Sequence, residues 1–483
     1  MRITLLLSLV VFFSANPMAT PGLAAVEVSC DVHAPSGPTV RADAVGLSYE
    51  TSILLPNAQG TRYFRPGRPG LTTLLQTMGV RSLRIGGNSV DEASIPLPGP
   101  DDIDAVFTSA KAIGATVIWS VRLQDGKPED AERQAKHIYD HHRASLAQFA
   151  IGNEPYYYEK QLAADYLPRW TALRDAILRG FPGATFCGPD QNPDTRLYRE
   201  VVQALAPTGS FTVLSAHLYS FGCSYTNPKD GQKAKDRDEA KAVLKPRDPV
   251  AARKAMLAPE AYKNYQALLN RCLAATKGTN IAFRLTETNS YWFSGLQGAS
   301  DSVESGLWAA DYLAWWTLNG AQGVNFHTGD RTGGHINLPC RYAAFVAAGE
   351  GFEVRPLAYG MTLFSQVAQG TCLPVTLDPK APLSAYAFRR DANSLGLLII
   401  NRSDRDAAPQ DVTLRVAGAN VTAAQNLLLE SRPEGTPAMT LGGQAIGADG
   451  TWTGTWADQP LQDGAVTLRL QPLSAAAVRL TIP

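Results

Sequence analysis

Short apolar runs alternate with amphipathic stretches along residues 43–372. The apolar runs predict buried β-strands, and recurrence of apolar residues every three to four positions predicts helices. Eight strand–helix pairs result. The predicted strands are 44–50, 82–85, 116–121, 146–151, 184–188, 211–218, 281–286 and 323–326. The predicted helices are 70–78, 101–113, 128–142, 161–178, 195–205, 259–275, 302–318 and 357–367.

The predicted strands look apolar on both faces, as a covered parallel sheet requires. Repeated βα units form either a doubly wound sheet or a closed barrel. Eight successive pairs within residues 43–372 favour a (β/α)8 TIM barrel. A doubly wound sheet usually has a glycine-rich phosphate turn after its first strand, and none follows residues 44–50.

The pattern changes to short strands without helices over residues 373–483. Strands are expected at 384–388, 395–400, 412–416, 465–470 and 476–482, and two of them alternate apolar with polar residues. This predicts a C-terminal antiparallel β-sandwich. Within residues 25–42, the extended segment 26–32 is expected to add a strand to that sandwich.

The first 24 residues have the pattern of a signal peptide. Arg2 precedes the apolar run 3–13, and the small residues Gly22, Ala24 and Ala25 follow it. The run is too short to span a bilayer. We therefore expect export to a periplasm or the extracellular space, with no membrane insertion after cleavage.

Charge gives no sign of a polyanionic partner, since Lys plus Arg and Asp plus Glu are both 44. We expect no nucleic-acid partner and a monomeric protein. The long insertion 221–257 is locally basic, with nine Lys or Arg against five Asp or Glu from Ser224 to Leu257. It is either a solvated surface loop or a rim that favours an anionic substrate.

The six cysteines permit disulfides in an exported chain. We expect a Cys223–Cys272 pair, because these residues flank the insertion, and a free core thiol at Cys187. The sequence has no C-x-x-C or H-E-x-x-H motif, its seven histidines form no evident ligand cluster, and no G-x-S-x-G elbow follows a strand. We therefore expect no metal site, no cofactor and no serine hydrolase.

Two glutamates end predicted strands of the barrel. Glu154 follows the fourth strand and Glu287 follows the seventh. Active sites of TIM barrels lie at the C-terminal ends of the strands, so both side chains should open on one face. One protonated and one ionised carboxyl group across a shared cleft are what glycosidic cleavage needs.

The motif Asn153-Glu154-Pro155, combined with Glu287, resembles the retaining barrel glycoside hydrolases of clan A. Leu83-Arg84-Ile85-Gly86-Gly87-Asn88 and Thr286-Glu287-Thr288-Asn289-Ser290 resemble glycoside hydrolase family 79 more specifically. That family contains β-glucuronidases and heparanase. The resemblance covers residues 43–370 and, more loosely, the sandwich. It implies a carbohydrate substrate, Glu154 as acid/base and Glu287 as nucleophile.

The resemblance also implies roles for neighbouring residues. Asn153 would bind the sugar 2-OH, Arg84 would keep Glu287 ionised, and Tyr219 would donate to Glu287. Glu50 would bind sugar hydroxyls, and Gly87 would allow close approach of the backbone to the sugar. Arg84, Tyr219 and Gly87 also have structural interpretations, as an ion pair, a core-edge residue and a tight turn, and Glu50 has a structural alternative as well.

The aromatic residues Trp119, Tyr291 and Trp292 are candidates for stacking on the sugar. Glucuronide-cleaving members carry a tyrosine, then glycines, where this chain has Trp292 and the segment 293–295. The loop 330–335, with Gly334, is an alternative source of donors for a uronate carboxylate. A retaining β-glycosidase for a neutral sugar and a non-catalytic carbohydrate-binding protein remain as alternatives to a β-glucuronidase.

Overall fold

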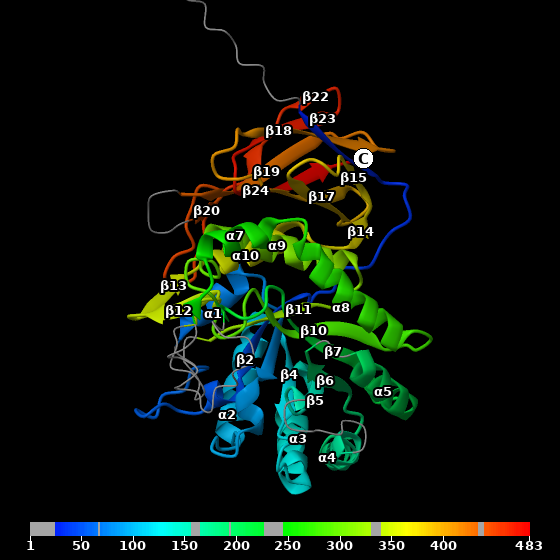
Figure 1. The fold of residues 1–483 in the computed structure, drawn as a ribbon, viewed down its shortest axis with the longest axis vertical. Coiled ribbons are helices and arrows are strands. Elements are labelled where there is room, and N and C mark those ends of the chain that lie inside the picture. Colours follow the sequence, from blue (N-terminus) through cyan, green and yellow to red (C-terminus); the bar gives the residue numbers. More distant parts are fainter. Residues whose placement is uncertain are drawn as a thin grey trace, which may run out of the picture.

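The computed structural model describes residues 25–65, 68–155, 165–192, 195–226, 245–329, 340–432 and 439–483. A barrel with outer helices forms one end of the molecule, and stacked β-sheets form the other (Figure 1). Within the described ranges, no helix combines the length and apolarity needed to cross a bilayer. The expected signal peptide, 1–24, lies outside the described residues.

The barrel is closed and built from eight parallel strands, which confirms the predicted fold class. Around the barrel the order is β10, β11, β2, β3, β4, β5, β6, β7. Their bounds are β2 Val45–Glu50, β3 Ser82–Gly86, β4 Thr116–Val121, β5 Leu146–Ile151, β6 Phe186–Gln191, β7 Phe211–Tyr219, β10 Ala282–Asn289 and β11 Val324–His327. The fourth and seventh barrel strands are therefore β5 and β10.

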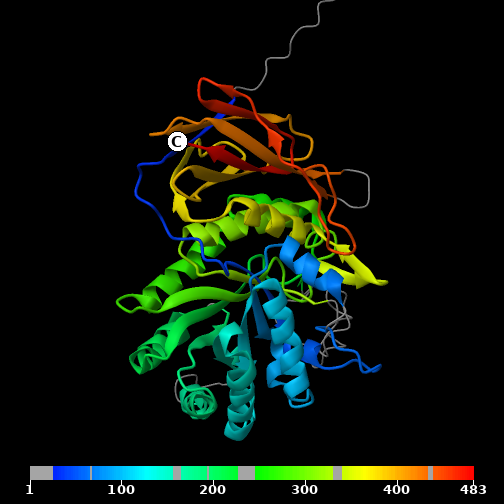
Figure 2. The same cartoon turned by 180° about the vertical axis from the view of Figure 1, so that it is seen from behind.

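Helices follow the barrel strands and surround them (Figure 2). They are α1 Pro69–Thr77, α2 Pro100–Ile113, α3 Pro128–His142, α4 Leu167–Gly180, α5 Thr195–Leu205, α8 Ala261–Thr276, α9 Val303–Leu318 and α10 Pro356–Val367. Local sequence sets several ends: α2 begins with a proline at its first position, and Gly114 ends it with a φ of 66°.

The interior of the barrel is more polar than its strand sequences suggested. The predicted strands looked apolar on both faces, yet buried polar residues from several strands are hydrogen-bonded across the interior. These residues are Ser48, Ser82, Arg84, Ser215, Arg284, Thr286 and Asn325. Because each has partners in the interior, the desolvation cost of burying it is offset.

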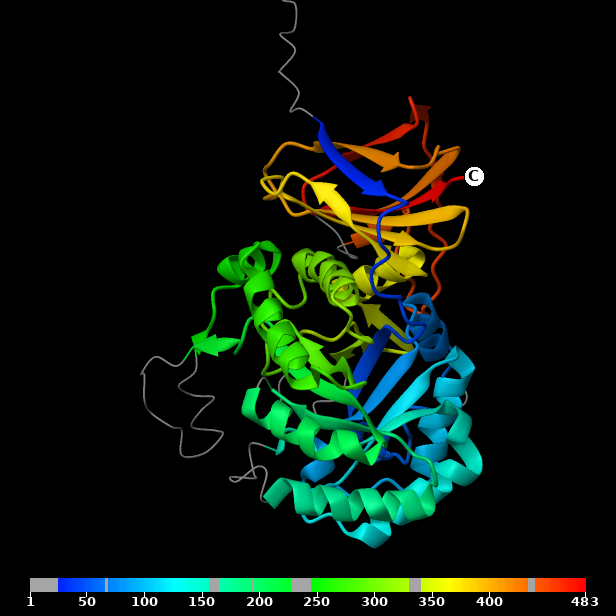
Figure 3. The same ribbon diagram turned by 90° about the vertical axis from the view of Figure 1, so that its right-hand side faces the viewer.

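Two sheets form the β-sandwich at the other end. One has the order β15 Val375–Leu377, β1 Val26–Asp31, β18 Gln410–Ala417, β23 Ala465–Leu470 and β22 Leu461–Gln462. The other has the order β14 Thr371–Leu373, β16 Leu383–Arg389, β17 Ser394–Asn401, β24 Ser474–Thr481, β19 Ala423–Ser431 and β20 Met439–Leu441, with β21 Ala457–Asp458 beside β19. The N-terminal β1 lies within the first sheet, parallel to β18 (Figure 3).

The barrel and the sandwich meet along α9 and α10. The buried carboxylate of Asp311 on α9 accepts hydrogen bonds from Tyr262 on α8 (2.7 Å) and from Tyr386 on β16 (3.0 Å). A hairpin, β12 Phe345–Ala348 and β13 Gly351–Val354, precedes α10. The sandwich therefore covers the outer helices of the barrel and contributes none of the residues at the strand ends described below.

The described parts of the insertion 221–257 contain two short strands and one helix. Strands β8 Tyr225–Thr226 and β9 Lys245–Pro246 pair antiparallel, and helix α7 Pro249–Leu257 follows. The expected Cys223–Cys272 disulfide is wrong, because both residues are free thiols, as is Cys187. Cys272 packs within the hydrophobic core, and burial raises the pKa of its thiol to about 12. Flanking an insertion in sequence did not bring the two cysteines together.

Candidate active site

Glu154 follows β5 directly and has an unusual backbone. Its φ is 46°, in the left-handed region, and Asp190 on β6 has a φ of 53°. Residues other than glycine rarely adopt this backbone conformation, and those that do cluster at functional sites. The backbone N–H of Glu154 donates to the carbonyl of Asp190 at 2.8 Å. This bond between neighbouring strand ends fixes the loop that carries Glu154.

The carboxyl group of Glu154 lies beside a buried imidazole. Its Oε1 is 3.0 Å from Nδ1 of His217 on β7. His217 is fully buried, and its Nε2 is 4.0 Å from Oδ1 of Asp190. The Glu154 side chain keeps 12% of its surface exposed, so a substrate at the strand ends can reach it.

Glu287, on β10, is surrounded by donors and cations. Its Oε2 accepts from Nη1 of Arg84 at 2.8 Å, and its Oε1 accepts from the hydroxyl of Tyr219 at 2.8 Å. His327 on β11 places Nδ1 3.6 Å from Oε2. Burial alone would raise the pKa of Glu287, but the charges of His327, His217 and Arg84 and the Tyr219 hydrogen bond lower it to about 2.

Arg84, on β3, connects the two halves of the site. It is fully buried, and its Nη2 donates to Oδ2 of Asp190 and to Oδ1 of Asn153, each at 2.7 Å. Although burial opposes the charged form, Asp190 and Glu287 raise the pKa of Arg84. In turn, burial would raise the pKa of Asp190, but the charge of Arg84 lowers it. The Arg84 guanidinium therefore lowers the pKa of two buried carboxylates, as the main cause for Asp190 and together with His327 and His217 for Glu287.

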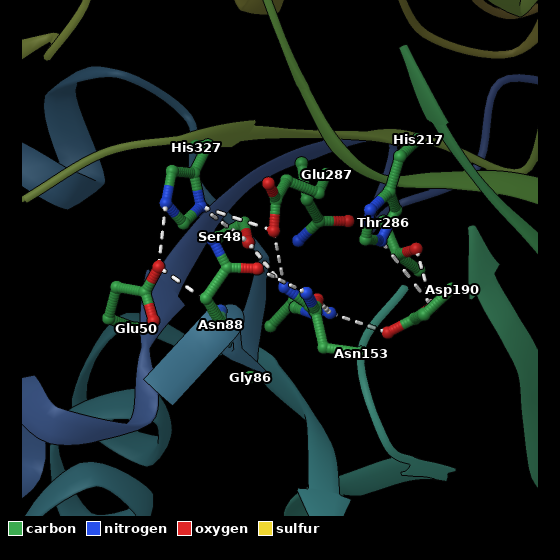
Figure 4. A network of polar contacts seen from close by, with 12 residues as sticks. Ser48, Glu50, Gly86, Asn88, Asn153, Asp190, His217, Thr286, Glu287 and His327 are labelled. Atoms are coloured by element: carbon green, nitrogen blue, oxygen red, sulfur yellow. Dashed lines mark hydrogen bonds and ion pairs between the residues drawn. The ribbon is translucent and has the colours of Figure 1, made fainter. Parts of the chain in front are cut away.

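A second ion pair lies on the other side of Glu287. Nε2 of His327 is 3.5 Å from Oε1 of Glu50, which ends β2 (Figure 4). The other oxygen of Glu50 accepts from the backbone and hydroxyl of Ser89 at 2.8 Å and 2.6 Å. Burial would lower the pKa of His327, but Glu287 and Glu50 raise it. Burial would raise the pKa of Glu50, but the bond with His327 lowers it.

Asn153 lies between Arg84 and the chain after β3. Its backbone N–H donates to Oδ2 of Asp91 at 2.8 Å, and its Nδ2 donates to Oδ1 of Asn88 at 3.0 Å. A carboxamide nitrogen has two N–H donors, so Nδ2 carries a second hydrogen besides the one donated to Asn88. Figure 4 shows the side chains of Asn153, Asn88 and Glu287 close to one another.

The glycine pair after β3 is explained by protein contacts. A Cβ on Gly87, whose φ is 69°, would lie 2.4 Å from the carboxyl group of Glu50. A Cβ on Gly86 would lie 2.6 Å from the guanidinium carbon of Arg84. The absent side chains thus make room for Glu50 and Arg84, and the predicted approach of Gly87 to a sugar is not needed to explain it.

Two of the three aromatic candidates are corrected by the structure. Trp119 on β4 is fully buried, packs on Phe107 and donates to Gln134, so it belongs to the core between barrel and helices. Tyr291 is 3% exposed and packs on Phe221. Neither presents a ring face to a substrate. Trp292 is 43% exposed and remains a candidate.

The last predicted substrate-binding residue, Gly334, lies outside the described residues, as does the rest of 330–339. Most of the basic insertion, 227–244, is also outside them. Of its described part, Arg247 is joined to the segment that pairs with Trp292. Its Nε donates to the carbonyl of Cys223 at 2.6 Å, and Cys223 is bridged to Trp292.

Sequence reasoning missed three buried members of the site, namely His217, His327 and Asp190. The signal for His217 was present, because side chains two apart on a strand share a face and Tyr219 had been selected. His327 ends the eighth strand one residue beyond its predicted limit. Asp190 lies two residues beyond the predicted end of the fifth strand at Gly188, whereas β6 continues to Gln191.

The expectation that the histidines form no ligand cluster is wrong. One group of possible metal ligands is found among the described residues, and it consists of Asp104, His137 and His142 on α2 and α3. It lies on the outer helices, apart from the carboxyl ends of the barrel strands. Glu154 and Glu287 are not members of this group.

The geometry at the strand ends can support acid–base and nucleophilic chemistry. Glu287 is held ionised by cations and a phenol, while Glu154 shares a hydrogen bond with one imidazole. Two carboxyl groups with such different partners suit one group that attacks and one that transfers a proton. The remaining polar groups, from Asn153 and Glu50, are placed around them.

Neither a protein-family model nor a curated protein sequence matches this chain. Solved structures do. A 4-O-α-L-rhamnosyl-β-D-glucuronidase from Fusarium oxysporum 12S is 18% identical, with a TM-score of 0.68 over 93% of this chain and 99% of that one. A family 51 arabinofuranosidase from Xanthomonas axonopodis pv. citri is 16% identical, with a TM-score of 0.61 over 94% and 99%. A family 44 xyloglucanase from Paenibacillus polymyxa is 11% identical, with a TM-score of 0.60 over 95% and 99%. At these identities the similarity establishes the shared fold.

Proposed function

We propose that this protein is an exported, retaining glycoside hydrolase that cleaves β-linked glucuronides. Glu287 is the nucleophile and Glu154 the acid/base. The proposal is carried by one observation: carboxyl groups from the fourth and seventh barrel strands lie in a shared network, and one of them is strongly held in its ionised form. Export rests on the N-terminal sequence alone.

Similar folds support the reaction class. The three solved structures named above are a glucuronidase, an arabinofuranosidase and a xyloglucanase, all of which are enzymes of carbohydrates. A TIM barrel on its own does not define an activity, because many unrelated enzymes share it. The paired carboxyl groups at the strand ends are therefore the stronger support.

In the first step, an oxygen of Glu287 attacks the anomeric carbon while the bond to the leaving oxygen breaks. Glu154 gives its proton to that oxygen, and a covalent glycosyl ester with Glu287 results. Arg84 and Tyr219, each 2.8 Å from Glu287, keep its carboxylate ionised and oriented before attack. His327 supports the same charge state from the other side.

In the second step, Glu154 is a carboxylate and takes a proton from water. The water oxygen attacks the anomeric carbon, and Glu287 leaves as a carboxylate, so the configuration of the sugar is retained. Asn153 donates its free amide N–H to the sugar 2-OH, and this bond strengthens in the transition state. Glu50 accepts from a further hydroxyl with the exposed part of its carboxylate.

The preference for a glucuronide is supported by the rim beside Trp292. Arg247 is exposed there, and its backbone N–H donates to Ser224 at 3.0 Å. Among the described residues, the Arg247 guanidinium is bonded through Nε alone, so its outer N–H groups can pair with a carboxylate. The glucuronidase among the solved structures of similar fold agrees with this substrate class.

A retaining β-glycosidase for a neutral sugar is the second candidate, favoured by the exposed indole of Trp292. A flat aromatic face suits the apolar face of a sugar ring without any charge. The two candidates share their catalytic residues and differ in the contribution of Arg247. Binding measurements on both sugar types therefore separate them.

The test is a panel of nitrophenyl glycosides: β-glucuronide, β-glucoside, β-galactoside and β-xyloside. We expect the wild type to hydrolyse the glucuronide and Glu287→Gln to hydrolyse no member of the panel. Arg247→Gln should have a raised KM for the glucuronide alone. Arg133→Gln, on the outer face of α3, is the matched control and should change nothing. Hydrolysis of neutral members only would select the second candidate. A folded protein that cleaves no member and binds no sugar would overturn both.

A further inference from the structure

Three side chains on two outer helices of the barrel point their polar atoms at one another. Asp104 lies near the start of α2, and His137 and His142 lie in the last turns of α3. Nε2 of His137 and Nε2 of His142 are each 2.7 Å from the same oxygen, Oδ1 of Asp104. Helices α2 and α3 lie side by side on the outside of the barrel (Figures 1 and 2).

The two imidazoles are held in place by their surroundings. The ring of His142 stacks on Phe107, with centroids 5.0 Å apart and planes 16° apart. The ring of His137 lies 4.7 Å from that of His141. His137 and His142 are 18% and 16% exposed, whereas Asp104 is 49% exposed. The group is thus fixed on the protein side and open on the side of Asp104.

Two imidazoles and a carboxylate are a ligand set that proteins use for zinc, with water in the fourth position. All three ligand atoms lie within 4.8 Å of one another. Tetrahedral zinc with bonds of about 2.05 Å needs ligand atoms roughly 3.3 Å apart, so the carboxylate would move outward by roughly 0.6 Å. Its exposed position makes that movement easy.

We propose that Asp104, His137 and His142 bind a divalent late transition metal, of the zinc type, and thereby connect α2 to α3. The competing explanation is a pair of N–H donors bonded to one carboxylate, which has the same short distances. The two explanations differ in what happens when the ion is supplied. This site is independent of the proposed glycosidase, because its residues lie on helices and not at the strand ends.

The experiment uses the full mature chain, stripped of metal with a chelator and titrated with Zn²⁺ by calorimetry. Co²⁺ is titrated in parallel, because tetrahedral Co²⁺ has intense visible absorption. The test variants are His137→Gln and His142→Gln, whose amides can still donate to Asp104 in the metal-free fold. His33→Gln, an exposed histidine before the barrel, is the matched control.

We expect one Zn²⁺ per chain, an affinity loss of at least about 100-fold in each test variant, and no change in His33→Gln. Zn²⁺ should raise the Tm of the wild type and not that of the His137→Gln/His142→Gln variant. Glycoside hydrolysis without added metal should be the same in all of these proteins. Equal affinity in the wild type and the double variant, or no saturable binding by the wild type, would overturn the proposal. Persistent binding that inhibits hydrolysis would assign the ion to the carboxylates at the strand ends instead.

Discussion

Removing the guanidinium of Arg84 should leave two carboxylates without their shared cation. The substitution Arg84→Met keeps most of the side-chain volume but deletes four hydrogen bonds, including those to Asp190 and Glu287. Breaking a buried ion pair by removing one partner costs about 3–5 kcal/mol. We expect a loss of that size in the free energy of unfolding at pH 7, because Asp190 is fully buried.

When Asp190→Asn is added to Arg84→Met, it removes one of the two carboxylate charges that Arg84→Met leaves without their cation. Alone, Asp190→Asn should cost about 1–3 kcal/mol, because it weakens hydrogen bonds but leaves Arg84 paired with Glu287. The double variant should be less destabilised than the sum of the single variants, with a coupling energy of about 1–3 kcal/mol. As a control, Asp311→Asn at the barrel–sandwich contact should combine additively with Arg84→Met.

The sign of the pH effect follows from the lowered pKa values of Asp190 and Glu287. In the wild type, both groups stabilise the fold above their unfolded pKa values, and this contribution is lost as the pH falls through the folded ones. Without the charge of Arg84 both pKa values rise, and the effect is larger for Asp190, because His327 and His217 still lower the pKa of Glu287. The difference in stability between wild type and Arg84→Met should therefore shrink as the pH falls toward the unfolded pKa values of about 4.

The assay is equilibrium urea unfolding, followed by tryptophan fluorescence and far-UV circular dichroism at pH 7 and pH 5. Coincidence of the two transitions checks that one unfolding free energy applies to both parts of the molecule. Additivity of Arg84→Met and Asp190→Asn within about 0.5 kcal/mol would refute the shared-cation reasoning. A destabilisation that is equal at both pH values would do so as well.

Three further predictions concern single groups of the site. Glu154→Ala should slow the hydrolysis of glycosides with poor leaving groups by about 10²–10⁴-fold, and that of dinitrophenyl glycosides much less, because only the former need the proton. Equal rate losses on both substrates would count against the acid role of Glu154. Tyr219→Phe should lower kcat by about 10–100-fold, because a hydrogen bond to a charged group contributes about 1.5–3 kcal/mol, whereas the buried control Tyr265→Phe should leave kcat unchanged in the same steady-state assay. The pKa of His327 is raised in the folded protein. Protonated His327 therefore stabilises the fold below the unfolded pKa of about 6.5, and this contribution is lost as the pH rises through the folded pKa. In His327→Gln, the free energy of unfolding should decline less above pH 6.5 than in the wild type. Parallel pH–stability curves for the wild type and His327→Gln would contradict this.

The barrel was predictable because its signal is periodic and repeated. Each of the eight predicted strands begins within about two residues of its observed start, and Glu154 and Glu287 stand out as acidic residues after predicted strands. The sandwich was predictable for the same reason, since alternation in 412–416 and 466–470 matches strands β18 and β23. Local periodicity carries this information without any knowledge of the tertiary contacts.

The polar network was only partly predictable, because its contacts are between strands and not along them. Asp190 contacts Arg84 from 106 positions away, and nothing local marks that pair. Trp119 was misassigned because an aromatic residue in a barrel strand faces either the site or the helices, and the strand pattern here did not distinguish the faces. The Asp104 cluster was missed because its members come from two helices.

The central claim is that Glu287 forms the covalent intermediate. Its most direct test is incubation with a 2-deoxy-2-fluoro glycosyl fluoride of the sugar that the nitrophenyl panel selects, which slows the second step more than the first. Peptide mapping by mass spectrometry should then find one fluoroglycosyl group per chain, attached to Glu287 and absent from Glu287→Gln. Turnover of the panel sugar with a label on another residue, or with inverted product and no label, would contradict the account.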